Sequence, residues 1–302
     1  MTATPRYYTG RVIKAAQESE MEIASMDDPV KFGGVFHRLS FGEAIGRGLL
    51  TDYQVAVVGV DDATYRKWAE KGVLVRRDNK TTDARTLASQ IGLAKAMRKY
   101  DLRRVISFHS RVLRAKRFAA EMPDVIAWLP ARQRPSGRLW AGYASGDMSA
   151  GERHVRLQRL RRLDEGERGL LTNARCLSEG VDLPTLDGVA FIDPRGSEVD
   201  IVQAVGRAIR LADDKTIGTI VIPIFIDLAA NPETALDSSA FKAVWDVLSA
   251  LRSHDDDLGE RLDELRRQLG QGRRIKIPEK IHVDLPATVG RWRVPVTEST
   301  RF

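Results

Sequence analysis

The chain has 302 residues, and its 48 lysines and arginines exceed its 41 aspartates and glutamates, which gives a formal charge of +7. Its 43% hydrophobic content can build a core, which argues against a disordered or fibrous protein. The apolar runs are only strand-length, too short for a membrane-spanning helix, and the single cysteine excludes an internal disulfide framework. No signal-peptide pattern is present, so we expect a reducing, cytoplasmic compartment.

Strand-length apolar runs alternate with segments of helical periodicity through most of the chain. We expect strands at 53–60, 105–108, 139–144, 169–172, 188–192 and 217–226. Helices are expected at 83–100, 111–121, 150–163 and 198–211, and another near Asp61 or Asp62. This alternation predicts an α/β fold, in which right-handed crossovers join parallel strands and helices sandwich the sheet.

The two ends of the chain differ from this pattern. Two apolar stripes after residue 231 predict a helical hairpin, with Asp255, Asp256 and Asp257 at the start of its second helix. The tail from Arg273 shows no clear period. We therefore divide the chain into a connector at 1–50, an α/β domain at 51–230, and a helical extension and tail at 231–302.

Basic residues gather in two segments, nine within 95–117 and five within 153–162. Solvated helix faces would explain either segment alone. Because both flank the motifs below, they favour a phosphate backbone as the partner.

The most informative motif is QAVGRAIR at 203–210. On a helix, Gln203, Arg207 and Arg210 fall in one narrow stripe, and apolar residues point the opposite way. Two guanidiniums aimed together suit the stabilisation of charge on a transferring phosphoryl group. An amphipathic helix with surface arginines is the alternative.

Three other segments carry recognisable chemistry. In SEGVDLP at 178–184, a glycine allows close backbone approach to a nucleotide, and the aspartate can accept from a ribose hydroxyl. A plain turn has the same composition. RVISFHSR at 104–111 is a strand that runs into a Ser/Arg loop, and TATP lies at 2–5.

In order, these segments resemble motifs III to VI of superfamily 2 helicases. Residues 2–5 resemble motif III, 108–111 motif IV, Thr172 with 178–184 motif V, and 203–210 motif VI. Residues 146–153 resemble the loop and helix start that precede motif V. The resemblance runs from residue 1 to about 226 and implies the second RecA-like domain of an ATP-dependent helicase. Residues 25–29 with 39–53 also resemble the interdomain connector of translocases in restriction–modification and phage-defence systems.

The resemblance implies a role for each motif. The catalytic residues would be Arg207, Arg210 and Gln203. The nucleotide-binding residues would be Glu179, Gly180, Asp182 and Gly206. The nucleic-acid-binding residues would be Ser110, Arg111 and Thr172, and the coupling residues Thr2 and Thr4. The implied partners are DNA, and ATP with Mg²⁺ held mainly by a first RecA-like domain; no metal ligand is expected in this chain.

The phosphate-binding loop Gly-x-x-x-x-Gly-Lys-Ser/Thr and the Asp-Glu box do not occur in this sequence. In the family both precede motif III. We therefore expect a first RecA-like domain upstream in the full-length protein, and little ATP hydrolysis by the isolated chain. A non-catalytic RecA-like adaptor and an RNA-directed helicase stay open as alternatives. A dehydrogenase is disfavoured because no Gly-x-Gly-x-x-Gly occurs.

Some further residues have plainer expected roles. We expect His109 to close the end of a strand. Trp128 and Trp140 flank a loop rich in arginine, proline and glycine. They are expected to pack in the core or the loop, with base stacking as the alternative.

Overall fold

The computed structural model describes residues 18, 26, 28–35, 37–61, 84–174, 183–193, 198–213, 215–226, 239–270 and 278–286. Outside the described residues lie motif III and the region expected to be helical after Asp61. Residues 175–182, which include most of motif V, also lie outside them. Thr2, Thr4, Glu179, Gly180 and Asp182 are therefore without a structural description.

The helices and strands follow one another largely as expected. The strands are β1 (Asp52–Asp61), β2 (Arg104–Phe108), β3 (Arg138–Ser145), β4 (Glu167–Ala174), β5 (Gly188–Phe191), β6 (Ile217–Ile226) and β7 (Ile281–Asp284). The helices are α2 (Pro29–Phe32), α3 (Phe41–Gly46), α5 (Ala84–Lys99), α6 (Val112–Trp128), the 3₁₀ turn η1 (Ala131–Gln133), α7 (Ala150–Arg161), α8 (Glu198–Ala208), α10 (Ser239–Arg252) and α11 (Asp256–Gly270).

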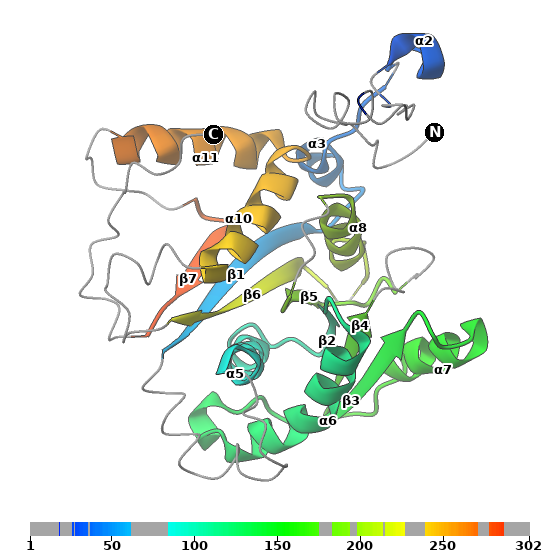
Figure 1. Ribbon diagram of the computed structural model, residues 1–302, viewed down its shortest axis with the longest axis vertical. Coiled ribbons are helices and arrows are strands. Elements are labelled where there is room, and N and C mark those ends of the chain that lie inside the picture. The colour runs from blue at the N-terminus through cyan, green and yellow to red at the C-terminus, as the bar shows by residue number, and fades with distance from the viewer. Residues whose placement is uncertain are drawn as a thin grey trace.

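The seven strands form one parallel sheet in the order β3-β4-β2-β5-β6-β1-β7 (Figure 1). The central strands β4 and β6 are buried along nearly their whole length, because helices cover both faces of the sheet. The predicted parallel α/β fold is thus confirmed.

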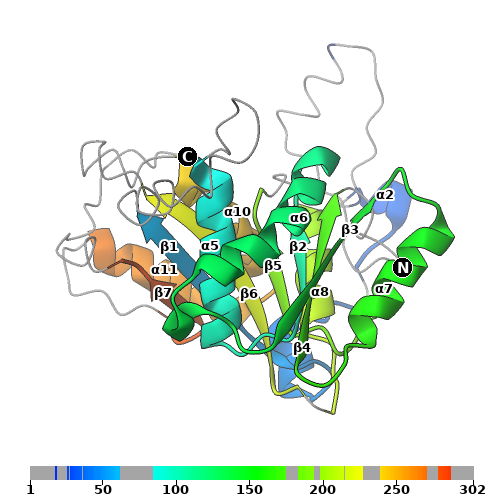
Figure 2. The same cartoon turned by 90° about the horizontal axis from the view of Figure 1, so that it is seen from below.

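Helices cover both faces of this sheet. Helices α5 and α6 pack on one face, and α8, α10 and α11 pack on the other (Figures 1 and 2). Successive residues of β1 alternate between the two cores: Val55 and Val57 face α8 and α10, whereas Ala56 and Val58 face α5. Helix α7 contacts β3 and β4, and its Leu160 belongs to the same core as the residues of α8 and α10.

Two helices end at places that the sequence did not predict. Helix α6 continues past residue 121 to Trp128 and passes through Pro123, which cannot donate a helical hydrogen bond. Met122 and Val125 are buried on the continuing apolar stripe, and their burial outweighs the lost bond. Helix α8 ends at Ala208, three residues early, because contacts with other segments take its terminal carbonyl groups.

The C-terminal tail contributes a strand to the sheet, although its sequence shows no clear period. Strand β7 pairs with β1 in parallel, and the Val55 amide donates to the carbonyl of Lys280 at 2.7 Å. A strand of four residues, of which His282 and Val283 are exposed, is too short to show alternation. The division at residue 230 stays a prediction, but α10 and β7 share the core and sheet of the preceding residues.

A buried polar cluster joins the turn between α10 and α11 to β1. Asp255 is fully buried and accepts from the Tyr53 hydroxyl at 2.7 Å, the Leu258 amide at 3.0 Å and the Lys280 ammonium at 3.4 Å. Burial, and then the Asp255 carboxylate, raise the pKa of Tyr53, so its hydroxyl stays protonated and donates.

The same turn also holds the N-terminal connector. The Phe41 amide donates to the carbonyl of His254, and the Arg38 guanidinium donates to that of Ser253, both at 2.7 Å. The connector and the helical extension are therefore in direct contact.

Of the helices that the structure describes, none is both long and apolar enough to cross a membrane.

Candidate functional site

Polar and basic side chains meet at the carboxyl ends of β2 and β5. Parallel α/β sheets bind ligands at the carboxyl ends of their strands. The Ser110 hydroxyl donates to Asp193, and Arg114 forms an ion pair with the same carboxylate at 3.0 Å. Arg111 is exposed and is the N-cap residue of α6, whose first turn contains no acidic residue. The positive end of the helix and the Arg111 guanidinium thus give this edge a field that favours anions.

His109 fixes the loop that carries Ser110 and Arg111. It is buried, its Nε2 lies 3.0 Å from the Ser107 hydroxyl, and its ring packs edge-on against Phe118 at 4.8 Å. Its amide donates to the carbonyl of Asn173 on β4 at 2.9 Å. The structure therefore places His109 at the end of β2, as expected.

Burial lowers the pKa of His109 from 6.5 to about 4, although Asp193 acts in the opposite direction and Arg114 adds a little to the fall. The folded chain thus keeps this ring neutral at pH values where the unfolded chain protonates it. We expect about 3 kcal/mol of stability, fully present above pH 6.5, to be lost as the pH falls from 6.5 to 4. Urea unfolding at pH 7 and at pH 4 measures this loss.

His254 contributes in the same direction, because burial also lowers its pKa, but it is half-buried and its share is smaller. His109→Gln should flatten the pH dependence, whereas His254→Gln should leave most of it. An equally steep fall in His109→Gln and in the unchanged protein would contradict the assignment.

Thr172 does not lie where the resemblance implied. Its side chain is fully buried, and its hydroxyl donates to the carbonyls of Ala115 at 2.8 Å and Gly142 at 3.3 Å. Those contacts hold α6 and β3 against β4. In this conformation the hydroxyl cannot reach a phosphate, so Thr172 can support the edge only indirectly.

Motif VI lies on α8 and just beyond it. Its apolar side, Ile201, Val205 and Ala208, is buried as expected. Arg207 is only 6% exposed, and Arg210 follows the last helical residue and is half-buried. The helical stripe therefore holds for Gln203 and Arg207, both on α8, but ends before Arg210. Gly206 is half-buried, and a Cβ added there would meet open space.

Lys215 ties motif VI to the segment that follows motif V, a role that sequence reasoning missed. Its ammonium donates to the carbonyls of Pro184 at 2.8 Å, Leu186 at 3.2 Å and Ala208 at 3.2 Å. The charge thus lies at the C-terminus of α8, where the helix dipole favours it. A single lysine in a short loop carries no signal of this contact in the sequence.

The structure does not bring all the predicted site residues together. Ser110 and Arg111 lie at the carboxyl ends of the strands. The end of α8 lies at the opposite end of the sheet, near the amino end of β1. The amide of Thr51, just before β1, donates to the carbonyl of Ile209 at 2.8 Å. Ser110 and Arg111 thus lie apart from the C-terminal end of α8.

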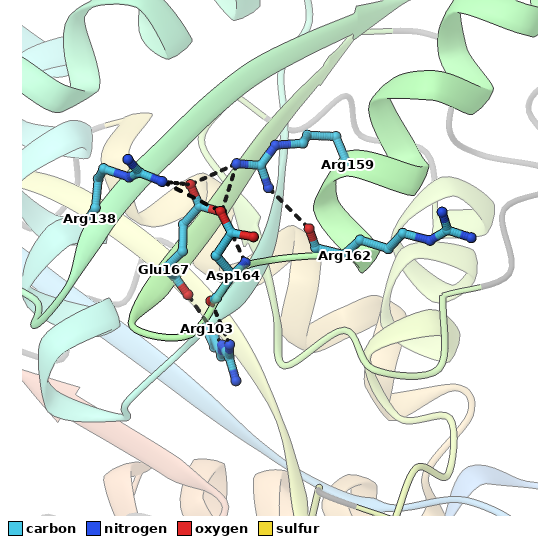
Figure 3. Close-up of polar contacts among 6 residues, drawn as sticks. All are labelled: Arg103, Arg138, Arg159, Arg162, Asp164 and Glu167. Atoms are coloured by element: carbon cyan, nitrogen blue, oxygen red, sulfur yellow. Dashed lines mark hydrogen bonds and ion pairs between the residues drawn. The ribbon is translucent and has the colours of Figure 1, made fainter.

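Part of the basic segment 153–162 serves the fold. Glu167, at the start of β4, is buried and accepts from Arg159 with both oxygens at 2.7 Å and from Arg138 at 3.2 Å (Figure 3). Arg103 donates to the carbonyls of Glu167 and Asp164 at the same place. The bond from Arg159 is the main reason that the pKa of Glu167 is lowered. This network joins α7 to the amino ends of β2, β3 and β4.

The parallel sheet with helices on both faces has the RecA-like architecture of the C-terminal domain of a superfamily 2 helicase. Residues 93–212 match the family described as helicase conserved C-terminal domain. The sequence-based recognition of this domain is confirmed.

Similar proteins include one of known structure, the "ATP-dependent Type ISP restriction-modification enzyme LlaBIII bound to DNA". It is 33% identical, with a TM-score of 0.73, over 87% of this chain and 17% of that one. A probable helicase from a Kenyan pig isolate of African swine fever virus is 27% identical over 87% of this chain and 26% of its own length. Its counterpart from a Malawian tick isolate is 26% identical over the same shares. The chain thus spans about a quarter of the length of these curated relatives.

Proposed function

We propose that the chain is the second RecA-like domain of an ATP-dependent DNA translocase of the restriction–modification type. The observation that carries the proposal is the placement of Arg207 and Arg210 at the end of α8, which Lys215 ties to the segment after motif V. A domain that only binds a partner, such as a RecA-like adaptor, has no need for two arginines at that position. The likeness to a DNA-bound, ATP-dependent enzyme supports the same function.

In this proposal ATP binds between this chain and a preceding RecA-like domain. Arg207 and Arg210 donate to its phosphates, Gln203 and Gly206 line the same side, and Glu179, Gly180 and Asp182 meet the nucleotide from motif V. Guanidinium groups fit phosphate oxygens. Mg²⁺ is held mainly by the preceding domain, as the resemblance to superfamily 2 helicases implies. Thr2 and Thr4 couple closure of the two domains to hydrolysis.

Ser110 and Arg111 contact the DNA backbone, and Thr172 supports them from within the core. Contacts of this kind bind phosphates without reading the sequence, and they weaken steeply with salt. The protein acts in the cytoplasm, where its DNA is accessible.

The DNA assignment is tested on the chain itself by Arg111→Ala. We expect about tenfold weaker binding of single-stranded DNA, because one charge-assisted contact is lost. The slope of log K against log salt should shrink by about 0.7. Fluorescence anisotropy at several salt concentrations measures both quantities.

Arg132→Ala is the matched control, because this arginine is exposed on η1. Equal weakening by both variants, or binding that is indifferent to salt, would contradict the assignment. Competition between DNA and RNA strands of the same sequence separates a DNA translocase from an RNA-directed helicase.

A further inference from the structure

Two cations converge on one aromatic ring at the exposed edge of the sheet. Tyr143 lies on β3, the edge strand, and its ring centroid is 5.7 Å from the ammonium of Lys116 and 5.9 Å from the guanidinium carbon of Arg156. Lys116 comes from α6 and Arg156 from α7. Three separate elements therefore build this cluster.

Within the part of the chain that the structure describes, neither cation of the cluster, Lys116 or Arg156, forms an ion pair with a carboxylate. Glu152, on the same helix as Arg156, is engaged by Ser149 in a capping box. The hydrogen bonds from Ser149 lower the pKa of Glu152, and the charge of Arg156 helps to lower it.

One turn further along α7 the situation is different. The guanidinium carbon of Arg159 lies 5.3 Å from the ring centroid of Trp140, but this guanidinium also donates to both carboxylate oxygens of Glu167. The Arg159 contact is therefore complete within the fold. The two cations of the cluster lie 5.7 and 5.9 Å from the centroid of the Tyr143 ring, so a phosphate bound beside this ring would be attracted by both.

The cluster lies beside the loop that carries Ser110 and Arg111. Tyr143 is two residues from the carboxyl end of β3, and Lys116 is five residues, or about 7.5 Å of helix, from Arg111. Strands β2 and β3 flank β4, so they are about 10 Å apart. A single strand of a few nucleotides spans that separation.

We propose that Lys116, Tyr143 and Arg156 form a second phosphate subsite, which takes the backbone of single-stranded DNA across the edge of the sheet beyond Ser110 and Arg111. The inference rests on the proposed DNA function and adds a path for the strand. The two cations bind one phosphate, and the Tyr143 ring holds their side chains in place.

The test compares a short strand, namely a dinucleotide that is too short to occupy both sites, with a long strand of about 16 nucleotides, the upper end of the site sizes of single-strand binders. Lys116→Gln and Arg156→Gln should each weaken binding of the long strand three- to tenfold and reduce its salt slope by about 0.7. Binding of the short strand at Ser110 and Arg111 should not change. Tyr143→Phe keeps the ring and should behave like the unchanged chain.

Arg132→Gln is the control, since it removes the same charge from η1. If Lys116→Gln and Arg156→Gln weaken the long strand no more than Arg132→Gln does, the subsite is overturned while the DNA function stands. If the unchanged chain binds neither strand, the proposed DNA function itself fails. If a polyglutamate peptide binds as tightly as DNA and only the two cluster variants lose it, the surface recognises an acidic protein, and the DNA assignment is overturned.

Discussion

If a first RecA-like domain precedes this chain as proposed, replacing Arg210 with alanine is expected to lower ATP hydrolysis by the two-domain protein by about a thousandfold. An arginine that reaches the transferring phosphoryl group contributes 10³ to 10⁵ in rate, because it stabilises charge that develops only in the transition state. Steady-state phosphate release with saturating DNA measures the loss. Binding of ATP should change much less than its turnover.

Arg210 is a cleaner site for this test than Arg207. Arg207 is 6% exposed, so its removal also disturbs the packing of α8, whereas Arg210 lies beyond the helix and is half-buried. Arg210→Lys keeps the charge without the planar fork and should fall between alanine and the unchanged protein. Hydrolysis at the normal rate in Arg210→Ala, with normal urea unfolding, would show that motif VI is not catalytic here.

The sheet was predictable because each central strand carries its signal locally. A run such as that of β6 is apolar along its length and is bounded by polar residues, which is typical of a strand buried on both faces. Motif VI was recognisable for a similar reason, since its residues are adjacent in the sequence. Local pattern was enough for the order of the elements from β1 to β6.

The features that were missed depend on contacts between distant segments. Lys215 reaches Pro184, 31 residues away, and Arg168 donates to the carbonyl of Leu102, 66 residues away. The burial of Thr172 follows from the way α6 crosses β4, which no local pattern encodes. Strand β7 exists because β1 offers it a pairing edge. Sequence periodicity therefore gave the sheet but not the polar contacts that position the motifs.

The contact between β1 and the turn at Asp255 predicts a large effect on stability. Asp255→Ala should lower the free energy of unfolding by about 3–5 kcal/mol, the usual result of breaking a buried charged pair. The change removes the N-cap of α11 and leaves the Tyr53 hydroxyl buried without its acceptor. Lys280 keeps its ion pair with Asp52 at 2.9 Å. The lost stability therefore comes mainly from the contact between β1 and the turn that joins α10 to α11. Urea denaturation at pH 7 measures the change.

Asp256→Ala and Asp257→Ala are the matched controls, because both carboxylates are exposed in the same helical turn. Each should cost about 0.3–1 kcal/mol through the helix dipole alone. Asp255→Asn retains one acceptor oxygen, whereas Asp255 offers one oxygen to Tyr53 and the other to the Leu258 amide, so this variant should lie between these values and Asp255→Ala. Hydrogen exchange at the Val55 amide, which bonds to Lys280, should accelerate in Asp255→Ala and not in the controls. A loss in Asp255→Ala no larger than in Asp256→Ala would mean that the helical extension is held to the sheet by its apolar contacts alone.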